Sequence, residues 1–167
     1  MDAECVKVVE IEKGFKALVA KEDLPKGTFL GDFYGKIYSS PTTYTHQIGP
    51  NKHLDHKGIV KFGNHSCSPN CRPVYHRRKD AETIEQDQDV EEVSWHLEST
   101  RDIAKGEEIR IDYNLTEYSM ASPFECRCGA NNCLRFVQGF KHLSPEEKRK
   151  RLPNVSPVIK QLIEKEL

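Results

Sequence analysis

The chain has 167 residues and a mass of 19.2 kDa, and 37% of its residues are hydrophobic, which suits one compact domain and excludes a wholly disordered chain. Its 25 basic and 26 acidic residues give a net charge of −1, so we expect no general electrostatic binding of nucleic acid. The longest apolar run has four residues and no signal-peptide block opens the chain, so we expect an intracellular protein that does not enter a membrane.

The first third of the sequence predicts short strands joined by turns. Apolar and β-branched residues fill 6–11, a second apolar run covers 17–20, and strand-like segments follow at 28–33 and 34–38. The sequence Leu-Pro-Lys-Gly at 24–27 predicts a tight turn. Short strands at intervals of about ten residues are typical of a mainly β architecture.

The middle of the sequence alternates expected loops with further strands. Polar residues and prolines predict a loop over 39–58, and two prolines with two cysteines predict an irregular loop over 64–73. The highly charged segment 76–92 is expected to be a solvated loop or hairpin tip, with a contact site for a basic partner as the alternative. Strands are expected at 93–101 and 108–113.

The last part of the sequence predicts two short helices. Ser144 and Ser156 are each followed by proline, which is the pattern of a helix cap followed by the first helical residue. Pro153 is expected to end the first helix. In the second helix the apolar residues recur at helical spacing, and they are Val158, Ile159, Leu162 and Ile163.

The cysteines provide the strongest sign of a bound metal. Cys126, Cys128 and Cys133 lie within eight residues, and such clustering in a chain without a secretory signal favours metal binding over disulfides. A structural zinc ion requires four ligands, so three local thiolates imply a fourth ligand from elsewhere. The candidates are Cys5, Cys67, Cys71 and the histidines, and the alternative is a set of thiols without a metal.

Two other segments carry candidate functional side chains. The run from Asn64 to Cys71 has hardly any apolar side chain, so its donors and acceptors suit a polar ligand better than a core. The segment from Gly106 to Asn114 on its own is typical of a turn followed by an ordinary strand. The order of these segments along the chain carries more information than either one alone.

Taken in order, these segments resemble the SET domain of protein lysine methyltransferases, followed by a post-SET zinc segment. The Asn64–Cys71 run matches the family's NHSCxPNC signature at every fixed position, and Gly106–Tyr113 is similar to its GEELTFDY segment. The spacing of the three clustered cysteines reproduces the post-SET pattern CxCx4C. Gly14–Ala20 and Tyr34-Gly35 are weaker matches, to the first family motif and to a YxGE-like segment.

The resemblance, which extends from about Glu10 to Phe140, implies a mainly β (β+α) fold. Such a fold consists of small β-sheets with a pseudoknot, in which the Asn64 loop and the strand leading to Tyr113 thread past each other, and of short C-terminal helices. We therefore expect a SET domain at residues 1–120, a post-SET zinc segment at 121–143 and a C-terminal helical tail at 144–167.

The same resemblance implies methyl transfer from S-adenosylmethionine to a lysine side chain, in a flexible protein segment such as a histone tail or in a non-histone protein. Tyr113 corresponds to the family's catalytic tyrosine, and Tyr34 to an aromatic residue lining the lysine channel. The residues implied to bind the cofactor are Gly14, Phe15, Lys16, Lys61, Phe62, Asn64 and His65. One structural Zn²⁺ would be held by Cys67, Cys126, Cys128 and Cys133, which leaves Cys71 as a buried thiol.

Methyl transfer suits these residue types. The attacking amine must be neutral, although free lysine has a pKa of about 10.4, and an aromatic channel beside a sulfonium charge favours the neutral form. The protein would mainly align the groups and exclude water, and the sequence shows no obvious paired carboxylates for a base. Thiolate ligands that fill a metal's coordination sphere disfavour a zinc hydrolase.

Three residues depart from the family pattern. Lys16 stands where the family usually has glycine, Lys36 where it has an acidic residue, and Ile111 where it has an aromatic residue that helps to limit the number of methyl groups added. A lysine at position 16 is either a contact for the cofactor carboxylate or a sign of weakened binding. A catalytically weak SET-like binding or scaffold module is therefore the alternative function.

Overall fold

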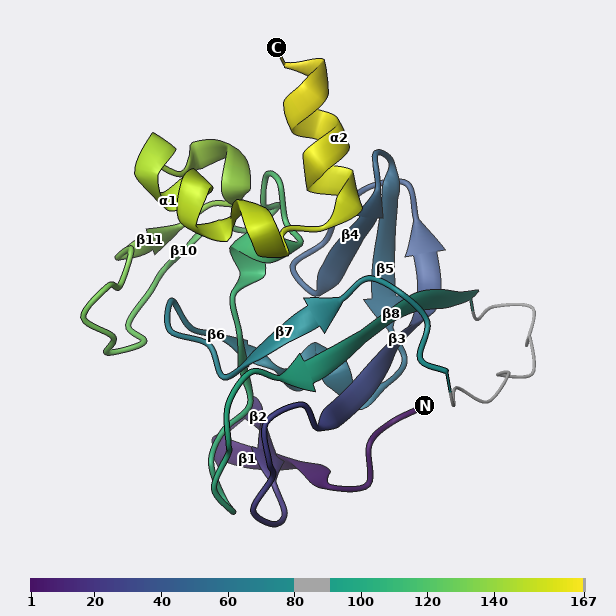
Figure 1. Ribbon diagram of the computed structural model, residues 1–167, viewed down its shortest axis with the longest axis vertical. Coiled ribbons are helices and arrows are strands. Elements are labelled where there is room, and N and C mark those ends of the chain that lie inside the picture. Colours follow the sequence, from purple (N-terminus) through teal and green to yellow (C-terminus); the bar gives the residue numbers. More distant parts are fainter. Residues whose placement is uncertain (80–90, 167) are drawn as a thin grey trace.

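Four small β-sheets and several short helices form the part of the chain that the computed structural model describes, residues 1–79 and 91–166 (Figure 1). The strands are β1 (Val6–Glu12), β2 (Phe15–Ala20), β3 (Phe29–Tyr38), β4 (Thr45–Gly49), β5 (Lys52–His56), β6 (Asn64–His65), β7 (Cys71–Val74), β8 (Glu91–Ser99), β9 (Arg110–Ile111), β10 (Phe124–Glu125) and β11 (Phe136–Val137). The helices are α1 (Pro145–Arg151), α2 (Pro157–Lys165) and the 3-10 helices η1 (Ile59–Phe62), η2 (Tyr113–Leu115), η3 (Phe140–His142) and η4 (Leu152–Asn154). The expected mainly β fold with short C-terminal helices is confirmed.

The largest sheet has the strand order β4-β5-β3-β8-β7, and its neighbouring strands are antiparallel. The two segments expected at 28–33 and 34–38 form the single strand β3. Gly35 lies inside this strand with a φ of +158°, and a β-carbon there would lie 1.9 Å from the carbonyl oxygen of Asp55. Gly35 therefore interrupts the run of apolar residues in the sequence but does not end the strand. Because it has no side chain, it lets β3 and β5 approach closely.

The prediction of a loop over 39–58 is wrong for the hairpin of β4 and β5. Its polar residues His46, Gln47 and His56 are buried rather than solvated. The two histidine rings are hydrogen-bonded to each other, and the Gln47 side chain accepts a hydrogen bond from the backbone of Tyr118. Buried polar residues with such partners resemble loop residues in a sequence, because the partners lie elsewhere in the chain.

Two short strands that are far apart in the sequence bring the functional segments together. Strands β6 and β9 pair in parallel, with Asn64 opposite Arg110 and His65 opposite Ile111. The approach is close at Gly63, where a β-carbon would lie 2.6 Å from the Ile111 side chain. The Asn64 loop and the segment leading to Tyr113 are therefore neighbours, as the resemblance implies.

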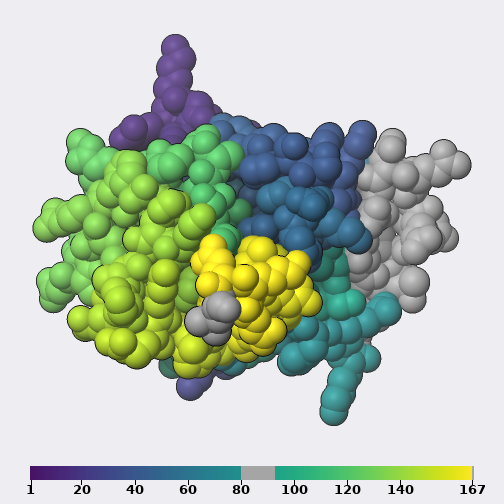
Figure 2. All heavy atoms as spheres, turned by 90° about the horizontal axis from the view of Figure 1, so that it is seen from above, coloured from purple at the N-terminus to yellow at the C-terminus, as the bar shows by residue number. Residues whose placement is uncertain are grey.

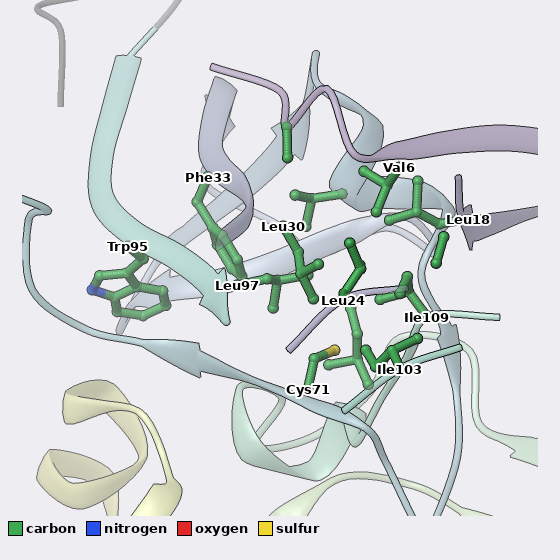
Figure 3. Packing of buried hydrophobic residues seen from close by; sticks show 14 of the residues in the cluster. Val6, Leu18, Leu24, Leu30, Phe33, Cys71, Trp95, Leu97, Ile103 and Ile109 are labelled. Atoms are coloured by element: carbon green, nitrogen blue, oxygen red, sulfur yellow. The ribbon is translucent and has the colours of Figure 1, made fainter. Parts of the chain in front are cut away.

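The main hydrophobic core joins side chains of the largest sheet to those of the β1–β2 hairpin (Figure 3). Leu18 of the hairpin and Phe33 of the sheet are both fully buried. Cys71 is also fully buried there, and its thiol donates a hydrogen bond to the backbone of Arg110 at 3.2 Å. Cys5 packs against the same core, so both of these cysteines belong to the packing of the sheet.

The C-terminal helices pack onto the rest of the protein. In Figure 2 the yellow residues of α2 lie between the yellow-green residues that precede them and the blue residues of the β3–β5 region. Val158 belongs to the main core, whereas Ile159 packs in a second cluster with Leu115, Phe140 and Val155. Ser144 and Ser156 cap the two helices as predicted, each hydroxyl accepting an amide hydrogen bond at 3.2 Å from three residues further on.

Most of the charged segment 76–92 lies outside the described residues, so the prediction of a loop there stays untested. None of the described helices is both long and apolar enough to span a membrane. The division at residues 120 and 143 also stays a prediction, although the segment beyond 143 is firmly packed against the sheet region.

Candidate active site and cysteine cluster

Six of the seven residues predicted to bind a cofactor surround one cavity of about 410 Å³. We call it the Phe62 cavity, and its lining residues are Gly14, Phe15, Lys16, Tyr44, Asp55, Lys61, Phe62 and Asn64. The β1–β2 hairpin contributes the first three, and η1 with the strand that follows it contributes the last three. Since small-molecule sites measure roughly 300–1,000 Å³, the Phe62 cavity is large enough for a nucleoside-bearing cofactor.

The Phe62 cavity offers two lysine ammonium groups, the carboxylate of Asp55 and the aromatic ring of Phe62. The ammonium groups of Lys16 and Lys61 lie 5.5 and 5.2 Å, respectively, from the centre of the Phe62 ring. The Asn64 side chain donates to the backbone oxygen of Lys16 at 3.1 Å and to the Glu108 carboxylate at 2.9 Å, which ties the β1–β2 hairpin to β6. Two ammonium groups beside a ring suit a ligand that carries both a carboxylate and an apolar or aromatic part.

A second, smaller space adjoins this cavity, because Tyr44 and Lys61 line both. We call it the Tyr113 chamber; it measures about 50 Å³ and is lined by Thr42, Thr43, Tyr44, Thr45, His46, Lys61, Tyr113, Glu117, Met120, Ala121 and Ser122. The hydroxyl oxygens of Thr43 and Ser122 lie 2.8 Å apart, so the two loops that form its wall are joined. A volume near that of one or two water molecules fits the end of one narrow side chain.

Tyr113 is held at both of its ends. Its hydroxyl donates to the carbonyl oxygen of Gly63 at 2.8 Å, and its backbone N–H donates to Nδ1 of His65 at 3.0 Å. Burial raises the pKa of the Tyr113 hydroxyl above its usual value, so this group stays protonated at neutral pH. Because the hydroxyl proton is already donated to the carbonyl oxygen of Gly63, the lone pairs of the hydroxyl oxygen are left to accept a hydrogen bond.

The ring of His65 links Tyr113 to the cysteine cluster and is not part of the lining of the Phe62 cavity. Burial lowers the pKa of His65 to about 4, so the ring is neutral. Since a backbone N–H can only donate, Nδ1 is the acceptor and the ring proton is on Nε2. That nitrogen lies 3.4 Å from Sγ of Cys67. The expected contact of His65 with a cofactor stays a prediction, and the ring already has two partners.

The four cysteines predicted to bind zinc come together. The sulfur atoms of Cys67, Cys126, Cys128 and Cys133 all lie within 4.8 Å of one another, and those of Cys67 and Cys126 are 3.9 Å apart. A tetrahedral site with Zn–S bonds of about 2.3 Å has sulfur atoms about 3.8 Å apart, so the donor set fits such an ion. Burial raises the pKa of Cys67 and of Cys126. At Cys128 burial also raises the pKa, but hydrogen bonds from backbone groups such as that of Ala130 outweigh it and lower the pKa to about 6, which favours the thiolate at that residue.

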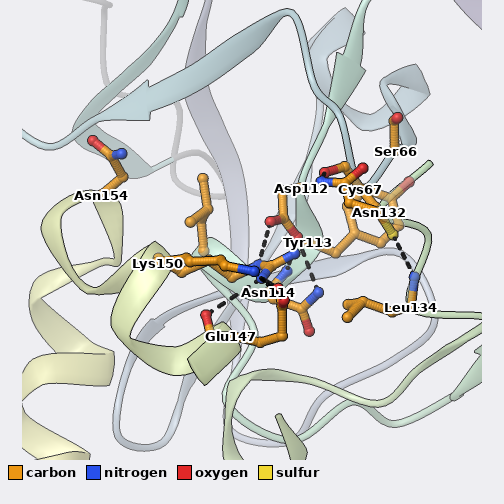
Figure 4. Close-up of polar contacts among 12 residues, drawn as sticks. Ser66, Cys67, Asp112, Tyr113, Asn114, Asn132, Leu134, Glu147, Lys150 and Asn154 are labelled. Atoms are coloured by element: carbon orange, nitrogen blue, oxygen red, sulfur yellow. Dashed lines mark hydrogen bonds and ion pairs between the residues drawn. The ribbon is translucent and has the colours of Figure 1, made fainter. Parts of the chain in front are cut away.

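Helix α1 supports the residue that precedes Tyr113. Arg151 is 7% exposed, and its Nε donates to the Asp112 carboxylate at 2.6 Å. The other oxygen of this carboxylate accepts hydrogen bonds of 3.0 and 2.9 Å from the backbone and side chain of Asn114, and dashed lines at Asp112 mark these contacts in Figure 4. Glu147 also pairs with Arg151. The expected helical tail is therefore connected to the segment that carries Tyr113.

Tyr34 lies away from both cavities. Its hydroxyl donates to Asp2 at 3.2 Å, and burial together with Asp2 raises its pKa to about 12. The neighbouring Phe33 lies where the pairing of β3 with β8 is irregular, and its ring packs against His46 and His56 at centroid distances of 5.4 and 4.9 Å. Phe33 rather than Tyr34 thus contacts a residue of the Tyr113 chamber, and the predicted channel role of Tyr34 stays a prediction.

A third cavity is larger, about 640 Å³, but it contains none of the predicted cofactor residues. Its charged residues pair with one another, Arg101 with Glu107 and Arg110 with Glu108. These pairs leave no single charge to attract an ionic ligand. The Phe62 cavity is therefore the better candidate for a cofactor.

Sequence patterns did not indicate His46, Glu117 or Arg151 as residues of the site. His46 and Glu117 line the Tyr113 chamber, and Arg151 is buried against Asp112. None of the three belongs to a motif, and each partner lies in another part of the chain. The residues on either side of His46, Thr45 and Gln47, are both polar, so no local signal distinguishes this strand from a loop.

Comparison with known families identifies a SET domain at residues 16–114, more than half of the chain. The chain is 29% identical to the "Histone-lysine N-methyltransferase, H3 lysine-36 specific" of Mycosarcoma maydis over 152 residues, which cover 80% of this chain and 14% of that protein. It is 31% identical to "Methyltransferase flvH" of Aspergillus flavus over 125 residues, which cover 74% of this chain and 60% of that protein. The chain therefore spans only part of the length of these relatives.

A solved structure with a similar fold is the "crystal structure of KRYPTONITE in complex with mCHG DNA and SAH". It superimposes with a TM-score of 0.58 at 22% sequence identity and covers 78% of this chain and 28% of that chain. This similarity confirms the expected fold.

Proposed function

The chain belongs to the SET-domain methyltransferase family, and from this premise we propose that it transfers a methyl group from S-adenosylmethionine to a lysine side chain of a protein. The observation that carries the proposal is the junction of the two cavities. The Phe62 cavity has the size of a cofactor site, and the Tyr113 chamber, which shares Tyr44 and Lys61 with it, has the size of the end of one side chain. A methyl donor and a methyl acceptor in these two spaces would meet beside Tyr113.

The residues of the Phe62 cavity fit S-adenosylmethionine by their chemistry. This cofactor supplies a methyl group that is activated by a sulfonium charge. Lys16 and Lys61 would bind its carboxylate, and Phe62 would provide an apolar surface. Asn64, through its hydrogen bonds to Lys16 and Glu108, would keep the two walls of the cavity in place.

Tyr113 would orient the lysine amine. Its hydroxyl oxygen accepts a hydrogen bond from the amine, while its own proton remains on the bond to Gly63, so the lone pair of the nitrogen is directed away from the tyrosine. Holding two reactants in line converts their encounter into an intramolecular step. The narrow walls of the chamber exclude water from the amine.

The cysteine cluster would hold one structural Zn²⁺. Four thiolates complete a tetrahedral shell and leave no open position for a reacting group. Through the contact of His65 with Cys67 and with Tyr113, a bound ion would also hold the backbone of Tyr113 in place.

A flexible lysine-containing segment is the proposed substrate, because an extended peptide can add to a strand edge and insert one side chain. The relative from Mycosarcoma maydis is named as specific for histone H3 lysine 36, which makes a histone tail the first substrate to test. Non-histone proteins of the cell remain the second class, and direct contact with nucleic acid is not part of the proposal.

Calorimetric titration with S-adenosylmethionine tests the proposal. We expect the wild-type chain to bind the cofactor, and Asn64→Ala to bind it at least about tenfold more weakly, because the tie between Lys16 and the β6 segment is lost. Asn131→Ala, an exposed change outside the Phe62 cavity, serves as the control. Absence of binding by the wild type would contradict the proposed function.

The scaffold alternative depended on Lys16 and Ile111. The Lys16 ammonium lies over the Phe62 ring at the rim of the cavity, and Ile111 is buried in the main core. Neither side chain fills the space proposed for the cofactor, which supports the enzyme over the scaffold.

A further inference from the structure

Glu117 is a buried carboxylate that lines the Tyr113 chamber. It is 7% exposed, and its Oε1 accepts hydrogen bonds from the backbone N–H of Gln47 at 2.8 Å and from the Thr116 hydroxyl at 3.4 Å. Both bonds use Oε1, and no hydrogen bond from the described part of the chain reaches Oε2. Within the described residues Glu117 makes no ion pair. A buried carboxylate without a cation is costly, so the position favours a cationic or proton-donating ligand.

Other titratable groups line the chamber together with Glu117. They are Tyr44 just before β4, His46 on β4, Tyr113 on η2 and Lys61 on η1, and His56 on β5 contacts His46. Nδ1 of His46 and Nε2 of His56 lie 2.7 Å apart, so these two nitrogens are hydrogen-bonded to each other, whereas the buried Nδ1 of His56 has no hydrogen-bond partner among the described residues. The hydroxyl of Tyr113 already donates its hydrogen bond to the carbonyl oxygen of Gly63. Lys61 is exposed and also lines the Phe62 cavity, which leaves Glu117 as the group available to an amine that enters the chamber.

The pKa values of Glu117 and His46 show which of the two can accept a proton at neutral pH. Burial raises the pKa of Glu117 to about 7, and burial lowers the pKa of His46 to about 4. At neutral pH the imidazole of His46 is therefore neutral and a poor proton acceptor. A group with a pKa near the working pH is the most effective in general acid–base catalysis, and among these residues that group is Glu117.

We propose that Glu117 is a catalytic residue, whose carboxylate accepts a proton from the ammonium group of the target lysine in the Tyr113 chamber. In this step an N–H bond breaks, its electron pair stays on the nitrogen as the lone pair, and an O–H bond forms on the carboxylate. The inference rests on the proposed function, since it needs a lysine in the chamber. Tyr113 then orients the neutral amine that Glu117 has produced.

A merely structural role for Glu117 is the competing explanation, because its bond to Gln47 joins β4 to the segment after η2. Glu117→Gln separates the two roles. The glutamine keeps an oxygen acceptor for the Gln47 N–H and nearly the same shape, but it cannot accept the lysine proton. Glu164→Gln, an exposed change on α2, is the matched control.

The first measurement is the pH profile of methyl transfer to a histone H3 peptide. At pH 7.5 we expect Glu117→Gln to lower kcat/KM by about 100-fold, the lower end of what a positioned proton acceptor contributes. The deficit should shrink as the pH approaches about 10.4, where lysine loses its proton unaided. The wild-type rate should fall below about pH 7, and the Glu164→Gln control should follow the wild type. A structural role predicts a deficit that does not depend on pH.

The second measurement does not require activity and uses the wild-type protein. The amide of Gln47 donates to Glu117, so its ¹H and ¹⁵N chemical shifts report the ionisation of that carboxylate. We expect an inflection near pH 7, which n-butylamine shifts to lower pH because its ammonium form binds the carboxylate. Glu117→Gln should abolish both effects.

The outcomes separate this inference from the proposed function. An active wild type with an equally active Glu117→Gln variant at pH 7.5 would overturn the inference alone. A wild type that transfers no methyl group would contradict the proposed function, and the titration of the Gln47 amide would then decide the inference. The inference is overturned if this amide shows no inflection between pH 5.5 and 8.5, or if n-butylamine does not shift the inflection.

Discussion

Two segments support the residues around Tyr113, and they differ in what holds them. The cysteine segment from β10 to β11 has a two-residue ladder and a small cluster in which Cys67, Cys126 and Val137 are the buried members. The C-terminal helices bury Val158 and Ile159 in two clusters. They also place Arg151 in a buried ion pair with Asp112. The first segment therefore has little core of its own and brings the four cysteines together, whereas the second is held by packing and charge.

This difference explains how one site can be supported from two sides. A segment that has little core of its own folds when a metal is bound, so the contact from Cys67 through His65 to Tyr113 would depend on the proposed zinc ion. Packed helices need no ligand to keep their place. The predictions below test this contrast in order of decreasing effect.

Removal of the metal should have the largest effect. Chelation of purified protein should abolish the amide hydrogen-exchange protection of residues 124–137 and leave that of α2 nearly unchanged, because binding of a structural zinc ion is worth about 10–16 kcal/mol in small zinc modules. Cys126→Ser should have the same effect, and Cys5→Ser, outside the cluster, is the control. Equal loss of protection in both segments would remove the contrast.

Replacement of Arg151 should have the next largest effect. Arg151→Met leaves the Asp112 carboxylate buried without its cation, which should lower the free energy of unfolding by about 3–5 kcal/mol. The exposed neighbour Lys150→Met should change it by less than about 1 kcal/mol. Urea denaturation measures both. Adding Asp112→Asn to Arg151→Met should restore part of the lost free energy of unfolding. If the losses caused by the two single variants instead add up in the double variant, the ion pair is not the cause.

Acidification should have a smaller effect, through the hairpin that α2 packs against. Burial lowers the pKa of His46 from 6.5 to about 4 and that of His56 well below 6.5. Below about pH 6.5 the unfolded chain therefore binds more protons at these two histidines than the native protein does. Stability should therefore be lost as the pH falls from about 6.5 to about 4, by about 1–3 kcal/mol. Glu117, with its raised pKa, acts in the opposite direction and favours the native state as the pH falls through about 7.

Thermal denaturation between pH 4 and pH 7 measures the acid dependence. His46→Gln should flatten the curve, because it removes one of the two buried imidazoles, whereas a change at the exposed His142 should not. An unchanged slope in His46→Gln would show that other groups govern the acid sensitivity.

The sequence predicted those features whose signals are local. The Asn64–Cys71 signature, the cysteine spacing and the serine caps of both helices each lie within a few consecutive residues, and the structure places the four cysteines together. The residues around the Phe62 cavity were also predicted as a group, because the family motifs that contain them are short and ordered.

The remaining features depend on partners that are distant in the sequence. Glu117 bonds to Gln47, 70 residues away, and Arg151 to Asp112, 39 residues away. A buried histidine or glutamine has the same local pattern as an exposed one, which is why β4 and β5 were predicted as a loop. Phe33 is a further example, because its ring packs against His46 and His56 of other strands and no motif in the sequence indicates these contacts.

Single-turnover methyl transfer at saturating S-adenosylmethionine tests the central claim most directly. We predict that the wild-type chain methylates a lysine of a histone tail or of another cellular protein. Tyr113→Phe keeps the ring but loses the hydroxyl, so this variant should bind the cofactor with nearly unchanged affinity and transfer the methyl group about 100-fold more slowly. Absence of methylation by the wild type across histones and a cell lysate, or equal rates for the two proteins, would contradict it.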